Sequence, residues 1–100
     1  MENPFENKIL GIKIKVEERR NIKNIMLFLR SFGYTWSNTK SIVPQFLVST
    51  NDIIIIYIGR SKYLLYSTMK GHILRERTEL LLSYEDILML MEKCNYEIPN

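Results

Sequence analysis

An uninterrupted apolar run at residues 53–58, Ile-Ile-Ile-Ile-Tyr-Ile, is the feature that most constrains how this chain can fold. β-Branched residues favour an extended backbone, and turn-forming residues bound the run, with Asn51 and Asp52 before it and Gly59 after it. Successive side chains of a strand point to opposite faces of the sheet, so a strand that is apolar at every position is expected to be buried on both faces. The run therefore predicts the central strand of a sheet.

The length of the chain predicts a single domain. One hundred residues are expected to form one compact unit, residues 1–100, that buries about two thirds of its unfolded surface. Such a domain has little room for an enclosed active-site cavity, which lowers the expectation of an enzyme. The 14 basic and 11 acidic residues leave a net charge of +3. This charge is too small to identify a nucleic-acid partner, and it argues against an acidic nucleic-acid mimic.

The cysteine count and the first residues predict a cytoplasmic protein, in the host cell cytoplasm if the protein is viral. Cys94 is the only cysteine, so the sequence offers neither an internal disulfide nor a cysteine-based zinc site. Residues 1–6 carry acids where a secretory signal would carry lysines followed by an apolar stretch. The longest apolar run is far shorter than the roughly 20 residues of a membrane helix, so no membrane contact is expected.

The first third of the sequence predicts a strand followed by a helix. Isoleucine and valine alternate with lysine over residues 12–16, which is typical of a strand with one buried face. Acids at positions 17 and 18 suit the first turn of a helix because they complement its dipole. Apolar residues then recur at helical spacing until Gly33, a residue type that commonly ends helices.

A meander of three strands is predicted for the middle of the chain. Its strands are residues 46–50, 53–58 and 63–67. Asn51 and Asp52 would form a two-residue hairpin turn between the first two strands, because both residue types tolerate positive φ.

The last third predicts a loop at residues 69–79, an optional short strand at 79–82 and a final helix. Ser83 is a good N-cap, acids occupy the first turn after it, and an apolar stripe reaches Cys94. The order β-α-β-β-β-(β)-α predicts an α+β fold with a mostly antiparallel sheet of four to five strands and two helices on one face. Two helices cover only one face, so residues 69–79 or another molecule must cover the other face of the central strand.

No residue pattern in the sequence indicates catalysis. His72 and Cys94 are the only candidates for a thiol–imidazole pair, and no spacing rule joins them. The glycines are isolated, so no phosphate-binding loop is expected. The acidic pairs at 17–18 and 85–86 occupy helix starts, where the helix dipole already explains them. We therefore expect no catalytic residue, no metal site and no cofactor.

Basic and aromatic residues form the candidate partner-binding surface. Basic residues gather in predicted loops between positions 60 and 77 with tyrosines nearby, and these residue types dominate protein interfaces and also stack on bases. Solvated charge is the simplest interpretation of the basic residues, and a core role is the simplest interpretation of an aromatic pair that shares a strand face. The candidate partner-binding residues are Tyr34, Trp36, Arg60, Lys62, Tyr63, Tyr66, Lys70, Arg75 and Arg77.

Two short motifs carry a resemblance to a group of phage proteins. Gly-Tyr-Thr-Trp at residues 33–36 follows the predicted first helix, and Ser-Tyr-Glu-Asp at residues 83–86 begins the last one. In this pattern the chain resembles small uncharacterised bacteriophage-encoded α/β proteins, over most of residues 8–94. The resemblance implies a protein that binds and disables a host machine, and it supplies no catalytic residues. The basic segment at residues 69–77 is longer than in the simplest form of the pattern, which makes it the preferred site of individual function.

Three classes of function follow from these observations. The leading expectation is a non-enzymatic phage-type protein that binds and inhibits a host protein or protein–nucleic-acid complex, in host takeover or anti-defence such as anti-CRISPR or anti-restriction. The alternative is a small nucleic-acid-binding accessory protein, whose salt-dependent binding would need Arg75 and Arg77. A small hydrolase or nucleotide-binding enzyme is the third class and would need a convergent polar pocket. A homodimer formed through the second sheet face is a further expectation.

Overall fold

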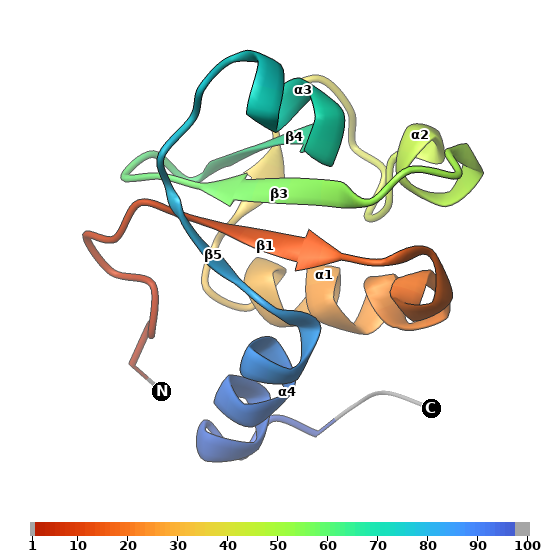
Figure 1. Cartoon of the computed structure of the whole chain (residues 1–100). Coiled ribbons are helices and arrows are strands. Elements are labelled where there is room, and N and C mark those ends of the chain that lie inside the picture. The colour runs from red at the N-terminus through yellow and green to blue at the C-terminus, as the bar shows by residue number, and fades with distance from the viewer. Residues whose placement is uncertain (1, 98–100) are drawn as a thin grey trace.

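A computed structural model describes residues 2–97 and shows an α+β fold built on one open five-stranded sheet (Figure 1). The strands are β1 (Leu10–Ile14), β2 (Thr35–Trp36), β3 (Ile54–Ile58), β4 (Tyr63–Thr68) and β5 (Leu80–Leu82). The helices are a 3-10 helix, η1 (Val16–Asn21), and the α-helices α1 (Ile22–Arg30), α2 (Gln45–Ser49), α3 (Met69–Leu74) and α4 (Tyr84–Lys93).

The sheet is mixed, with the strand order β2-β4-β3-β1-β5. Among the three inner strands, β3 lies antiparallel to both β4 and β1, whereas β5 lies parallel to β1 and β2 lies parallel to β4. The prediction of a mostly antiparallel sheet is therefore correct for the centre and wrong for both edges. Each edge strand is reached through a crossover that contains a helix, and such crossovers are what parallel pairing requires.

The central strand β3 is buried at all five of its positions, as the isoleucine run predicts. Ile54, Ile56 and Ile58 belong to the main hydrophobic core, which also contains apolar residues of α1 and α4. These two helices lie on one side of the sheet, in agreement with the prediction of two helices on one face (Figure 1). Ile55 and Tyr57 point to the opposite side and are also buried.

The short helix α3 covers the second face of the sheet (Figure 1). The prediction of a loop over residues 69–79 is wrong for its first six residues, where Thr68 caps the helix by accepting a hydrogen bond from the Gly71 N–H. Gly71 disfavours helix in isolation, which explains the prediction of a loop. In the fold its lack of a side chain is needed, because a Cβ at this position would lie 2.6 Å from Oγ of Ser67 on β4.

The segment at residues 46–50 forms helix α2 and the following link, so the predicted strand and its hairpin turn at residues 51–52 are wrong. Pro44 precedes the helix, where its fixed φ and missing N–H carry no penalty. Only Leu47 of this helix is buried, while Phe46 and Val48 are exposed. One buried side chain suits a single helical turn, whereas a strand would bury alternate residues.

The other boundaries agree more closely with the sequence. The first strand lies two residues earlier than predicted, and the segment after it begins as the 3-10 helix η1 before it continues as α1. The optional strand at residues 79–82 is present as β5. Ser83 caps α4 as predicted, because its Oγ accepts a hydrogen bond from the Asp86 N–H and the Asp86 carboxylate accepts one from the Ser83 N–H.

Gly11 provides a sharp test of packing on the second sheet face. A Cβ at Gly11 would lie 2.8 Å from methyl groups of both Ile55 and Leu81, whereas a Cβ at Gly59 would meet nothing within 4 Å. We expect Gly11→Ala to lower the free energy of unfolding by about 1–3 kcal/mol through overpacking. Gly59→Ala should change it by less than about 0.5 kcal/mol. Urea denaturation measures both values, and equal midpoints for the two variants would contradict this packing.

Candidate functional site

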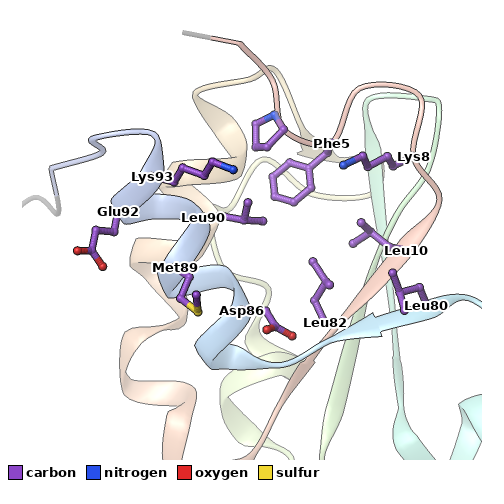
Figure 2. A pocket seen from close by; sticks show the side chains of 11 residues that line it. Phe5, Lys8, Leu10, Leu80, Leu82, Asp86, Met89, Leu90, Glu92 and Lys93 are labelled. Carbon is purple, nitrogen blue, oxygen red and sulfur yellow. The ribbon is translucent and has the colours of Figure 1, made fainter.

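An apolar groove lies between α4 and the β5 edge of the sheet (Figure 2). Its volume is about 770 Å³, which falls in the range of small-molecule sites. Three parts of the chain contribute to it: the N-terminal segment, the strand pair β1–β5 and helix α4. The lining residues are Pro4, Phe5, Lys8, Leu10, Leu80, Leu82, Asp86, Met89, Leu90, Glu92 and Lys93.

The floor of the groove is part of the hydrophobic core, and its rim is exposed. Phe5 and Leu10 are almost fully buried. Leu80 pairs with Leu10 in the parallel β1–β5 ladder, yet 67% of Leu80 is exposed, and Met89 on α4 is equally exposed. Two large apolar side chains therefore project into solvent beside a hollow that is itself apolar. An exposed apolar surface is a candidate for an interaction site.

The groove borders an unpaired sheet edge. Within residues 2–97, β5 pairs with β1 on one side and with no strand on the other. An edge strand presents backbone N–H and C=O groups that another chain can pair with, and proteins usually protect such edges with charge, proline or bulges. β5 is Leu-Leu-Leu and carries no charge or proline, so its length of three residues is what limits such pairing. Its edge and the groove together form a surface suited to an incoming polypeptide.

Charged residues lie at both ends of the groove. Figure 2 shows Lys8 and Lys93 beside Phe5 at one end and Asp86 near Leu82 at the other, while the Glu92 carboxylate points away. Asp86 is engaged with the backbone of Ser83. Neither lysine forms an ion pair with any residue in the described part of the chain. The Phe5 end of the groove therefore carries two lysines outside any ion pair among residues 2–97, with Glu2 beside them in the adjoining hollow.

A second cluster of polar side chains lies on the opposite face of the sheet. Tyr57 Oη and Nδ1 of the buried His72 share a hydrogen bond of 2.7 Å, and the Arg77 guanidinium lies 3.9 Å from the centre of the Tyr57 ring. Arg77 also forms an ion pair with Glu79, to which its Nε donates at 2.7 Å. Burial raises the pKa of the Tyr57 hydroxyl. The hydrogen bonds from Arg77 lower the pKa of Glu79 and raise the pKa of Arg77 itself.

This cluster attaches α3 and the segment after it to the sheet. The Glu79 side chain is only 14% exposed, and its Oε2 is buried without a partner among the described groups. The ion pair with Glu79 neutralises the charge of Arg77, so Arg77 is not available to bind a charged group on a partner. Internal attachment is therefore the simplest role of the cluster.

Three of the four predicted aromatic site residues pack against the rest of the protein, whereas Tyr63 is exposed. Tyr34 and Trp36 are buried, as expected for core residues, and the Trp36 indole N–H donates to the Ile42 carbonyl at 3.0 Å. Tyr66 lies between Trp36 and Phe46, with ring centres 5.5 Å and 5.3 Å away. A partner could therefore contact only the ring edges of Tyr34, Trp36 and Tyr66.

The predicted basic residues are dispersed rather than gathered in one patch. Lys62 lies over the Tyr34 ring, with its ammonium nitrogen 4.5 Å from the ring centre. Arg75 donates a hydrogen bond to Ser67 Oγ at 3.3 Å. Tyr63 and Arg77 line a hollow of about 110 Å³ over Tyr57. The remaining predicted residues, Arg60 and Lys70, are exposed.

Sequence reasoning missed the groove entirely. The sequence feature that could have indicated it is the Leu-Leu-Leu strand directly before an amphipathic helix that carries Met89 on its polar side. Three leucines in a row cannot all face the core of a sheet covered on one side by that helix, so one or more had to be exposed.

The two groups considered for chemistry in the sequence, a metal cluster and a thiol–imidazole pair, can be placed in the structure. Within residues 2–97, no three His, Cys, Asp or Glu side chains are close enough together to hold a metal ion. His72 on α3 and Cys94 at the end of α4 lie on opposite sides of the sheet (Figure 1). No helix in the described part is long and apolar enough to cross a membrane.

The lowered pKa of Glu79 predicts a pH dependence of stability. A carboxylate with a lower pKa in the folded state stabilises the protein above its unfolded pKa of about 4.3, and this contribution disappears as the pH falls through the folded value. Glu79→Gln should therefore lower the urea midpoint most at pH 7 and progressively less below about pH 4. Glu76→Gln removes an exposed carboxylate from the same segment and is the matched control. A deficit of Glu79→Gln that stays constant from pH 7 to pH 3 would contradict the ion pair.

No protein-family model matches the chain, and comparison with curated proteins and with solved structures gives no significant match. Any proposal of function therefore depends on the geometry of the groove, the β5 edge and the Tyr57 cluster.

Proposed function

We propose that this protein is a non-enzymatic binding protein that docks on a host protein complex and inhibits it, with the groove between α4 and β5 as its contact surface. The observation that carries the proposal is the coincidence of an apolar groove, two exposed side chains at its rim and an unpaired strand edge. Interfaces gain most of their affinity from apolar anchors that fill pockets of this kind.

The resemblance to small bacteriophage-encoded proteins supports the inhibitory part of the proposal. Proteins of this kind commonly bind and disable a host machine, so host takeover or anti-defence, including anti-CRISPR or anti-restriction activity, is the proposed setting. A surface that binds without performing chemistry is sufficient for this role.

The groove favours a protein partner over nucleic acid. Nucleic-acid affinity depends on basic side chains that neutralise several phosphates together. Here Arg77 is paired with Glu79, and Arg75 donates to Ser67. The groove is lined mainly by apolar side chains and carries two lysines at one end only.

Substitution at the groove rim tests the proposal. Leu80→Asp and Met89→Asp place a charge where a partner would bury an apolar side chain, and both residues are exposed, so the fold should survive. We expect each variant to lower capture of the partner from host lysate at least tenfold, because loss of an interface anchor costs about 2 kcal/mol or more.

Leu74→Asp is the matched control, because Leu74 is 74% exposed and lies on α3, on the opposite side of the sheet. Circular dichroism checks that all three variants keep the parent fold. Equal capture by Leu80→Asp, Met89→Asp and the parent protein would exclude the groove as the contact surface. Capture that disappears after nuclease treatment of the lysate would favour the alternative of a nucleic-acid-binding accessory protein.

A further inference from the structure

We infer that the occupant of the groove is an extended, apolar segment of the partner that pairs with β5 as a sixth strand and places a carboxylate between Lys8 and Lys93. This inference rests on the proposed function, because it names the chemistry of the partner that the groove would bind. Three independent features of the site carry it: the backbone edge, the apolar lining and the unpaired charges.

The backbone of β5 selects an extended chain. The free backbone N–H and C=O groups of an edge strand can form hydrogen bonds with an added strand about 4.8 Å away. This mode of binding is known as β-augmentation. Alternate side chains of that strand would point to the same sheet face as Leu80 and Leu82, which line the groove. An added strand would therefore use the edge and the groove at the same time.

The lining of the groove selects apolar side chains at those alternate positions. Phe5 and Leu10 make a floor that is almost fully buried, and Met89 forms the opposite wall from α4. Methionine is flexible and polarizable, so it adapts to side chains of different shapes. Covering Leu80 and Met89 removes two exposed apolar side chains from water.

The two lysines favour an acidic group on the partner. Figure 2 shows the Lys8 and Lys93 side chains approaching the groove from opposite sides at its Phe5 end. They form no ion pair within the described residues: the Glu92 carboxylate points away, and Glu2, which lines the adjoining hollow, is not bonded to either lysine. A carboxylate on the partner, from a side chain or a chain terminus, would complement this end of the groove.

Other occupants use less of the site. A fatty acid would satisfy the apolar lining and the lysines but would leave the β5 backbone groups unpaired. A second copy would bring a β5 strand without a free acid, because the preceding Glu79 is already paired with Arg77. It would also bring the same net charge of +3 and the same two lysines.

Selection from a displayed random-peptide library on the immobilised full-length protein tests the inference. We expect enriched peptides with apolar residues at alternate positions and an acid next to them. Methylation of the backbone nitrogen, one residue at a time, should weaken binding at every second residue of the bound segment, because only alternate N–H groups of an added strand face β5. Fluorescence polarisation with the labelled peptide measures each affinity.

The lysines are tested on the protein side. The double variant Lys8→Gln/Lys93→Gln should bind the acidic peptide about tenfold more weakly and should bind its Asp→Asn or Glu→Gln counterpart as well as the parent does. Lys23→Gln/Lys40→Gln removes two exposed lysines outside the groove and should change neither affinity.

Each alternative result overturns the inference in a recognisable way. Enriched peptides without alternate sensitivity to methylation would indicate a helical occupant, and unchanged binding in the Lys8/Lys93 variant would remove the carboxylate. Dodecanoate binding that displaces the peptides would favour a lipid. A dimer in light scattering that Leu80→Asp dissociates would favour a second copy. Partner capture that depends on Leu80 without any enriched peptide would overturn the extended segment and leave the proposed function standing.

Discussion

Burial of β3 on both of its faces is the constraint on which the rest of the structure depends. Its alternating side chains require a layer on each side, and α1 with α4 supplies one layer while α3 supplies the other. Each fully buried isoleucine contributes about 1.5–3 kcal/mol relative to an exposed one, so neither layer is dispensable. The need for the second layer explains why a six-residue helix with a glycine in it is retained: Gly71 brings α3 close enough to β4 to complete it.

The sequence was sufficient to predict the elements that are marked by a long apolar pattern or by a capping residue. It was insufficient to predict the short helices. The isoleucine run predicted β3 and the Ser83 cap predicted the start of α4, because burial and capping both restrict which residue types can occupy a position. Helices α2 and α3 have five and six residues, too few for a helical repeat of apolar positions to emerge. Pro44 was the one available indication of α2. The parallel edges depend on crossovers that no local pattern records.

The groove was beyond prediction for a related reason. Phe5, Leu10, Leu80 and Met89 come from segments far apart in the sequence, and their exposure depends on how β5 and α4 meet. The basic residues were visible in the sequence, but composition does not reveal that Arg77 is neutralised by Glu79. Residue types were therefore enough to suggest a binding function. The tertiary structure was needed to choose the apolar edge, in place of the basic loops, as the candidate surface.

The pairing of Leu10 with Leu80 has a consequence for the order in which the protein assembles. Strands β1, β3 and β4 can pair as soon as the first two thirds of the chain are available, whereas β5 closes a loop that spans most of the sequence. Loops of that length form late, because their closure entropy is offset only after the earlier contacts exist. We therefore expect the groove to form on the ribosome only after α4 has left the exit tunnel, later than the pairing of β1, β3 and β4.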